Sequence, residues 1–580
     1  MMNDESKQET RDEEELERIF FRASATDFQM ISGNPISYWL PKRAFSAFSI
    51  SPLKDVGNTR RGLQTGDKDR FIRSWFEVCL KNVDFESKDK LSASKSDAKW
   101  FLFNNGGDFR KWYGNLDLVV DWAGDGKRIK ESGGAIIPSE SLYFDSAACW
   151  SRLSTGNNAF RVHPEGVIPG DLTPCFYSSN DRYAISYLNS CVANYFLNVI
   201  NPTITKTVGD MAKIPAIYPG SIDSAVYENF ESLLGCHKQD WNEAELSWDF
   251  VFPRLLANPC VESLLSRAYD SLRSLWRTRV QEMQRLEEEN NRIFIAAYKL
   301  NQVLKPKVQL KEITLNCNPH YRYGGDKTEN ELEATLLVDT MREFLSYAVG
   351  CMFGRYSLDV PGLVLANQGD TLAEYLRQIP EPRFMPDEDN VIPLLDGEWF
   401  ADDVTERFRT FLRLTFGEEH YEENLAFVEQ ALGKDVRKYF IKDFYTDHVK
   451  RYKKRPIYWL FASPKGTFSA LIYLHRYRPD TVSVVLQYLR DFRKKLADEL
   501  SRQQTIIINP NAEQAKKTKA QKAIEILKKQ LLELDDYERD TLYPLATRQV
   551  QLSLDDGVKF NYLQLGSALK KITGLEAKED

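Results

Sequence analysis

Several residue types and patterns are scarce or missing in this 580-residue sequence, and their absence excludes whole classes of protein. The eight cysteines form no Cys-x-x-Cys pair and none follows Cys351, so we expect neither a disulfide framework nor a structural zinc cluster. No apolar run approaches the roughly 20 residues of a membrane span. The first residues are acidic, unlike a signal or transit peptide. These absences predict a soluble cytoplasmic protein with no membrane partner.

An excess of positive charge is also missing. The sequence has 77 Lys and Arg residues against 84 Asp and Glu residues, a net charge of -7. This balance excludes a uniformly basic nucleic-acid binder, although local basic regions remain possible.

Catalytic motifs are absent as well. There is no Gly-x-x-x-x-Gly-Lys phosphate loop, and the six histidines are scattered. An amino-methylating DNA enzyme needs an Asp/Asn-Pro-Pro-aromatic loop to hold a flipped base. The nearest matches are Asn318-Pro319-His320-Tyr321 and Asn34-Pro35-Ile36-Ser37-Tyr38, and neither follows the strand and Gly-rich turn of an S-adenosylmethionine domain. We interpret both as ordinary turns and predict no catalytic, metal or cofactor site in this chain.

Composition changes along the chain predict an α+β multidomain protein. The expected regions are a start without a fold of its own, opening with a charged helical stretch, at 1–50; a β-rich domain at 51–220; a helical spacer at 221–300; a mixed α/β domain at 301–480; and a helical hairpin with a short βα-like tail at 481–580. Within the β-rich region, residues 187–200 have helical spacing that ends at Asn201-Pro202, which predicts one helix.

Cations alternate with aromatic residues in one segment of the β-rich region. Residues 99–130 read KWFLFNNGGDFRKWYGNLDLVVDWAGDGKRIK, and Gly106-Gly107 permits a tight turn. Cations can reach phosphates or guanine edges and aromatic rings can stack on bases, so the composition fits DNA contact. The alternative is a β-hairpin with Trp112 and Trp122 in the core and its lysines in solvent. Composition alone does not separate the two.

A second basic segment lies between Lys450 and Lys495. It contains twelve Lys and Arg residues but only Asp480 and Asp491, a local charge of +10. Such a field attracts a polyanion despite the negative total. The alternative is a solvated helix face that acidic neighbours balance in space.

Ten ordered segments resemble a known family, the PglX adenine-specific DNA methyltransferases of BREX anti-phage systems. The matching segments are SGNPISYWL, RRGLQTGDKDRFIRSWFEV, KWFLFNNGGDFRKWYGN, ACWSRLSTGNNAFRVHPEG, NPTITKTVGDMAKIP, NRIFIAAYKL, EITLNCNPHYRYGG, SYAVGCMFGRYSLDVPGL, YKKRPIYWLFASPKGTFSALIYLHRY and LDDGVKFNY. They extend over the chain from about residue 20 onward, and they resemble the C-terminal half of the family.

The resemblance implies a division of labour. In this family an N-terminal Rossmann-like domain binds S-adenosylmethionine and carries the Asn-Pro-Pro-Tyr loop, while the C-terminal half holds a target-recognition domain with helical supports. By this likeness residues 1–50 are a remnant of, or linker from, the catalytic domain, and residues 51–220 are the DNA reader. The segment at 201–215 is also similar to the closing element of specificity domains in Type I and Type IIG restriction-modification proteins.

Candidate DNA contacts follow from this likeness and from the cation-aromatic pattern. Arginine is favoured for guanine and lysine for phosphate. The predicted contacts are Arg110, Lys111, Trp112, Tyr113, Arg161 and Lys206. Family members often have lysine where this chain has Asn105, which removes one cation from the predicted turn.

The leading hypothesis is therefore the DNA-recognition portion of an adenine-N6 methyltransferase in phage defence. Its partners would be double-stranded DNA, a separate or missing N-terminal methyltransferase domain and other BREX proteins. S-adenosylmethionine would serve the complete enzyme, and this chain would be inactive alone. The alternative is a non-enzymatic assembly subunit that docks other defence proteins through the basic and aromatic surfaces of residues 346–495.

Overall fold

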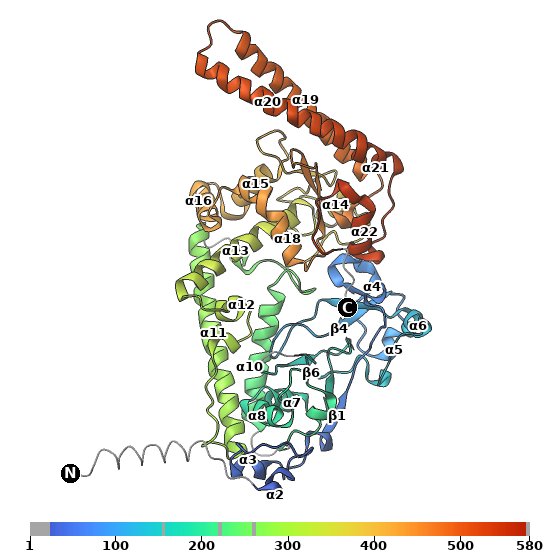
Figure 1. Ribbon diagram of the computed structural model, residues 1–580, viewed down its shortest axis with the longest axis vertical. Helices are drawn as coiled ribbons and strands as arrows, with labels where there is room; N and C mark the ends of the chain where they lie inside the picture. The colour runs from blue at the N-terminus through green and yellow to red at the C-terminus, as the bar shows by residue number, and fades with distance from the viewer. Residues whose placement is uncertain (1–23, 154–156, 218–222, 258–262, 576–580) are drawn as a thin grey trace, which may run out of the picture.

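The computed structural model describes residues 24–153, 157–217, 223–257 and 263–575, and the charged helical stretch predicted at the start lies almost wholly outside them. Short-stranded sheets form the first part of the chain, long helices follow, and a two-helix hairpin projects at one end (Figure 1). The predicted α+β fold class is confirmed. None of the helices in these described ranges is both long and apolar enough to cross a membrane.

Two small sheets form the β-rich region. One is antiparallel, in the order β1 (Gly57–Arg60), β9 (Cys175–Ser178), β6 (Ala147–Trp150) and β7 (Phe160–His163). The other has the order β2 (Ile72–Ser74), β5 (Leu118–Asp121), β4 (Trp100–Asn104) and β3 (Val83–Asp84), with β8 (Ile168–Pro169) beside β4. Strand β4 is buried along its whole length because it is an interior strand. It pairs antiparallel with β5, and Trp112 and Trp122 are buried, as the β-hairpin alternative predicted, but Lys111, which that alternative placed in solvent, is buried as well.

Helices α7 (Asp181–Leu188) and α8 (Cys191–Ile200) replace the single helix predicted at 187–200. The break comes at Ser190, whose side chain accepts a hydrogen bond from the amide of Ala193 and so starts a new helix. Asn201 ends α8 in an extended conformation before Pro202, as predicted.

Two long helices run along the β-rich region. Helix α10 (Asp223–Asn242) packs on α7, and the 33-residue helix α11 (Leu265–Ala297) packs on α8 (Figure 1). At 1.5 Å per residue α11 is about 50 Å long, so it can reach from the β-rich region to the following domain.

Helices surround a third sheet in the region after α11. This sheet has the order β10 (Ile392–Pro393), β12 (Ser469–Tyr473) and β11 (Tyr458–Ala462). The helices are α12 (Pro319–Tyr323), α13 (Glu329–Met352), α14 (Leu372–Gln378), α15 (Val404–Phe416), α16 (Tyr421–Leu432), α17 (Val436–Tyr439) and α18 (Tyr445–Arg451). One continuous hydrophobic core includes residues of the β-rich region, the two long helices and this region, so the three pack as one body.

The predicted helical hairpin consists of α19 (Thr481–Ile508) and α20 (Gln514–Tyr537). A second hydrophobic core joins its base to β11, β12 and the tail helix α22 (Gly557–Leu565). A βα-like tail was expected, but the described tail pairs with the third sheet only through a single bridge between Phe461 and Leu569.

Candidate nucleic-acid interface

The six residues predicted to contact DNA are buried, with at most 7% of each residue exposed. They are Arg110, Lys111, Trp112, Tyr113, Arg161 and Lys206. The sequence pattern identified them as surface groups, but residues 110–113 are enclosed against α10 and α11, and Arg161 and Lys206 are buried under loops of the β-rich region. A direct contact with DNA would require each side chain to leave its internal partners, and the structure gives these side chains supporting contacts instead.

Lys111 and Trp112 hold the β-rich region against α11. The ammonium of Lys111 forms an ion pair with the carboxylate of Glu287, and the indole nitrogen of Trp112 donates to Glu287 Oε1 at 2.9 Å. Burial raises the pKa of the Glu287 carboxyl, and Lys111 opposes that rise. Because both charges are shielded from water, each depends on the other for compensation.

Arg110 and Tyr113 occupy the same enclosed region. The Arg110 guanidinium donates to Asn316 Oδ1 at 2.5 Å, lies 3.8 Å from the carboxylate of Asp240 and stacks over the ring of Trp241. Burial raises the pKa of Tyr113, whose ring faces the ammonium of Lys238. These contacts fix the backbone that follows the Gly106-Gly107 turn.

Arg161 and Lys206 support surface loops from below. Arg161 donates to the carbonyl oxygens of Gly106, at 3.3 Å, and Arg110, at 3.4 Å. The ammonium of Lys206 donates to the carbonyl of Asn201, and burial lowers the pKa of Lys206. Both cations therefore stabilise loops that are far apart in the sequence but lie at the same edge of the β-rich region.

That edge is formed by five loop segments, which we call the loop rim. The loop rim consists of residues 60–64, 105–108, 151–153, 170–172 and 203–206. Hydrogen bonds join the segments one to the next: Asp171 N to Leu63 O (2.9 Å), Leu172 N to Asn105 Oδ1 (3.2 Å), Arg152 N to Leu172 O (3.1 Å) and Lys206 N to Arg152 O (3.0 Å). Gly106 and Gly107 have φ of +85° and +113°, so the predicted tight turn is present and needs glycine.

The loop rim presents both cations and apolar side chains to solvent. Arg61 and Arg152 lie on either side of Asp171, at 2.9 Å and 2.8 Å from its two carboxylate oxygens, with 46% and 34% of their side chains exposed. Leu153 and Ile204 are each 59% exposed and lie on adjacent extended backbone, since Leu153 bridges to Thr205. Guanidinium groups can reach guanine edges or phosphates, and aliphatic groups can contact thymine methyls, so these groups are suited to a DNA groove.

Sequence reasoning missed the loop rim as a unit because its five segments are far apart in the chain. Arg152, Leu153 and Ile204 lie within two of the segments that carried the family resemblance. The signal in the sequence that could have indicated this surface was a large aliphatic residue inside a polar loop, because such a residue is not accounted for by packing in a hydrophobic core.

Four of the twelve cations between residues 450 and 495 form ion pairs with carboxylates from elsewhere in the fold, and Arg478 pairs with Asp480 inside the segment. Its ion pairs are Arg451 with Glu245 (3.5 Å), Lys453 with Asp117 (2.5 Å), Arg478 with Asp480 (2.8 Å), Arg490 with Glu538 (2.7 Å) and Arg493 with Asp535 (2.6 Å). The alternative of acidic neighbours in space is therefore correct for the four cations whose partners lie outside the segment. The strong local field predicted from the sequence is reduced accordingly.

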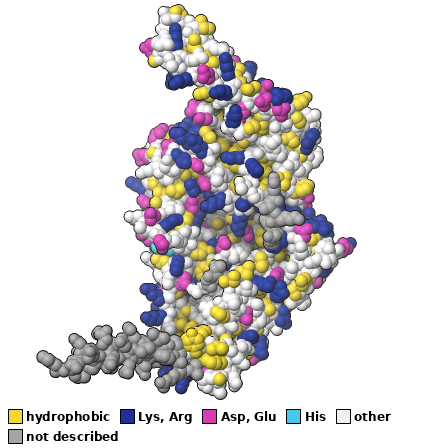
Figure 2. Space-filling view, in the orientation of Figure 1, with side chains coloured by type: hydrophobic (Ala, Val, Ile, Leu, Met, Phe, Trp, Pro, Cys, Tyr) yellow, Lys and Arg dark blue, Asp and Glu magenta, His cyan; other side chains and the backbone are white. Residues whose placement is uncertain are grey.

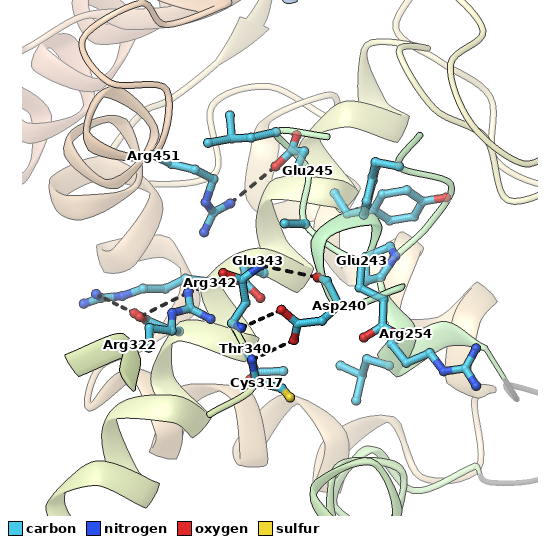
Figure 3. Close-up of a pocket in the computed structure, with 18 of the residues that line it drawn as sticks. Asp240, Glu243, Glu245, Arg254, Cys317, Arg322, Thr340, Arg342, Glu343 and Arg451 are labelled. Atoms are coloured by element: carbon cyan, nitrogen blue, oxygen red, sulfur yellow. Dashed lines mark hydrogen bonds and ion pairs between the residues drawn. The ribbon is translucent and has the colours of Figure 1, made fainter. Parts of the chain in front are cut away.

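A charged cavity of about 450 Å³ lies where α10 and α11 meet α13 and α18 (Figure 3). Its charged side chains pair with one another: Arg322 contacts Glu343 at 2.7 Å, and Asp240 accepts the backbone amides of Asn316 and Cys317 at 2.6 Å and 3.1 Å. The Asp240 hydrogen bonds join α10 to the segment before α12, and the Arg322 ion pair joins α12 to α13. Within the described ranges, no group of three or more His, Cys, Asp or Glu side chains is arranged to hold a metal ion.

Comparison with known proteins adds two long matches. The chain is 32% identical over 577 residues to the adenine-specific methyltransferase BrxX of Escherichia coli O9:H4 (strain HS), a match that covers 94% of this chain and 46% of that protein. It is 33% identical over 586 residues to the adenine-specific methyltransferase PglX of Lacticaseibacillus casei (strain Zhang), which covers 96% of this chain and 46% of that protein. The chain is homologous to the BrxX and PglX adenine-specific methyltransferases. The resemblance seen in the ten sequence segments is confirmed.

The chain spans about half the length of these BrxX and PglX relatives. The BrxX match nevertheless covers 94% of this chain, so it extends across the loop rim, the long helices and the hairpin. No protein-family model matches the sequence.

Homology to BrxX and PglX raises the question of whether the residues present fit S-adenosylmethionine. The parallel strand pairs in the described residues are only β3 with β4 and β4 with β8, each two residues long, which is not the parallel sheet of a doubly wound domain. Asn318 caps α12, and its amide nitrogen donates to the carbonyls of Leu310 and Ile313, so it is bound within a turn as predicted. The described residues therefore do not fit the cofactor, and we assign no methyl-transfer step to them.

Proposed function

We propose that this chain is the DNA-recognition part of an adenine-N6 DNA methyltransferase of the BREX type, which works in the cytoplasm in phage defence. The observation that carries the proposal is the homology to BrxX and PglX over 94% and 96% of the chain. Methyl transfer from S-adenosylmethionine, and extrusion of the target adenine, belong in this proposal to a catalytic domain that acts with the chain.

The loop rim is the proposed reading surface. Arg61 and Arg152 would leave Asp171 to contact guanine edges or phosphates, because a duplex offers several anionic partners in place of one carboxylate. Leu153 and Ile204 would contact thymine methyl groups in the groove. In this proposal the six buried residues position the loop rim and do not touch DNA.

A role as an assembly subunit without DNA binding has less support. It relied on basic surfaces within residues 346–495, and five of those cations are already paired within the protein. Variants of Arg110 and Lys111 would not distinguish the two functions, because their loss would disturb the packing of Lys111 on α11 and of Arg110 on Tyr321 of α12. Variants of the exposed loop rim separate them cleanly.

The test is selection of duplexes from a randomised library with the 580-residue protein, followed by binding titrations on the enriched site. We expect enrichment of one short asymmetric sequence and loss of that enrichment in the double variant Arg61→Ala, Arg152→Ala. The matched control is Arg285→Ala, Arg292→Ala, which removes two exposed, carboxylate-paired arginines from α11 and should retain it. Absence of salt-dependent binding to any duplex would contradict the proposed function.

A further inference from the structure

The outer half of the hairpin projects beyond the body of the protein. We define the distal arm as residues 497–530, the outer parts of α19 and α20 with their connection (Figure 1). The last buried residue of α19 is Leu496, whereas Ala520, Ile524 and Leu527 of α20 are buried against α19. The distal arm is therefore held by contacts between its own two helices.

Positive charge is concentrated on the α20 side of the distal arm. Residues 514–529 contain six lysines and one glutamate. Lys519, Lys522, Ile526 and Lys529 recur at intervals of three and four residues, so they form one ridge on the helix surface opposite the contact with α19. Ile526 is 58% exposed on this ridge, and Figure 2 shows Lys and Arg side chains along the projecting arm.

These lysines have few internal partners. In the described part of the chain Lys516 pairs with Glu513 at 3.5 Å, and no carboxylate lies within 4.0 Å of Lys517, Lys519, Lys522, Lys528 or Lys529. At the base of the same hairpin, Arg490 and Arg493 are both paired with Glu538. The charge of the distal arm is thus available to an external partner.

We propose that the distal arm binds the sugar-phosphate backbone of duplex DNA, outside the stretch that the loop rim reads and without regard to sequence. The inference rests on the proposed function for the identity of the partner and adds a second contact surface to it. A run of exposed lysines on a rigid helix matches a regular array of phosphates, and binding would release the counterions that phosphates hold.

The chemistry of the ridge favours DNA over a protein partner. The buried centres of protein interfaces are depleted in lysine and enriched in aromatic residues, whereas the ridge has three lysines and a single isoleucine. From Lys519 to Lys529 the ridge extends about 15 Å along α20, so its three lysines can contact phosphates on both sides of one groove, which is roughly 6 to 12 Å wide.

The test compares the salt dependence of DNA binding by the full 580-residue protein and the triple variant Lys519→Gln, Lys522→Gln, Lys529→Gln. Glutamine and lysine have similar helix propensities, and the three side chains face solvent, so the variant should fold normally. Each lost phosphate contact lowers the slope of log K against log salt by about 0.9, so the slope should fall by about 2 to 3. Affinity should fall equally for the enriched site and for a scrambled duplex.

The matched control removes the same charge elsewhere, in Lys305→Gln, Lys307→Gln, Lys442→Gln, and should leave slope and affinity unchanged. An unchanged slope in the arm variant, with wild-type protein still selecting its site, overturns the role of the distal arm and leaves the proposed function intact. Absence of duplex binding by the wild-type protein overturns both. Loss of capture of an acidic protein, with DNA binding unaltered, assigns the ridge to a protein partner and also overturns the inference.

Discussion

The cations predicted to contact DNA in the β-rich region and those of the distal arm look alike in sequence but occupy opposite environments. Lys111 and Arg161 are buried and bonded to groups of the protein, whereas Lys522 and Lys529 project from a helix with no carboxylate beside them among the described residues. Aromatic neighbours explain the difference, since a segment rich in tryptophan folds inward and takes its cations with it. A basic segment therefore indicates a binding surface only when its flanking residues cannot form a core.

The largest expected effect on stability comes from a substitution at the buried ion pair of Lys111. Glu287→Ala would leave Lys111 buried without a counter-charge and would free the indole nitrogen of Trp112. We expect the free energy of unfolding to fall by about 3 to 5 kcal/mol, measured by urea denaturation.

The control for this change is Glu289→Ala on the same helix, whose carboxylate makes an exposed pair with Arg292. It should change the free energy of unfolding by less than about 0.5 kcal/mol. Equal effects of the two substitutions would show that the Lys111 pair is not buried in the folded protein.

Acid should destabilise the body of the protein but leave the charge of the distal arm unaltered. Burial lowers the pKa of His163 to about 4 and of His237 and His475 to about 3, and lowers the pKa of His448 well below its usual value. Because these histidines have a lower pKa in the folded protein than their ordinary value of about 6.5, the unfolded chain takes up protons first as the pH falls below 6.5. Each histidine should therefore lower the free energy of unfolding by about 1.4 kcal/mol at pH 5.5. Burial and the nearby Asp389 raise the pKa of Asp387 to about 7, and its contribution between pH 7.5 and pH 5.5, about 1.9 kcal/mol, has the opposite sign.

The measurement is the free energy of unfolding at pH 7.5 and pH 5.5. We expect a net decrease at pH 5.5, because the four histidines together, at about 5.6 kcal/mol, outweigh Asp387 and the other buried carboxyls with a raised pKa, such as Glu287. The distal arm contains no histidine, so the salt slope of DNA binding should be the same at both values where the protein stays folded. Greater stability at pH 5.5 would contradict the burial of these rings.

The smallest expected effects on stability are at the loop rim and the distal arm. The double variant Arg61→Ala, Arg152→Ala removes partly exposed ion pairs, and each should change the free energy of unfolding by less than about 1 kcal/mol. Thermal unfolding and DNA-binding titrations of the same variants would check this. We expect a large loss of DNA affinity together with a small loss of stability. Destabilisation as large as that of Glu287→Ala would show that the loop rim belongs to the core.

Local patterns in the sequence predicted much of the fold. The helical hairpin followed from apolar residues such as Leu496 and Leu527 at helical spacing, and the hairpin of β4 and β5 was one of the two interpretations of residues 99–130. The break between α7 and α8 was missed because the cap at Ser190 interrupts a pattern that remains helical on both sides.

Contacts between residues far apart in the sequence could not be predicted from these local patterns. The positions of Arg110 and Lys111 depend on Asn316 and Glu287, more than 170 residues away, and no local pattern records those contacts. The same holds for the charge of residues 450–495, which Glu245, Asp117 and Asp535 neutralise from distant segments. The loop rim likewise exists only after five separated loops meet.

Photo-crosslinking tests the central claim most directly, that exposed groups of the loop rim and the distal arm contact DNA. A benzophenone side chain would be placed singly at Leu153, at Ile526 and, as control, at Leu91, an exposed leucine of the short helix α5 (Lys90–Ala93). Irradiation with labelled duplex at low salt should give crosslinks from positions 153 and 526 that disappear at high salt, and none from position 91. Equal crosslinking from all three positions, or none from position 153, would contradict the account.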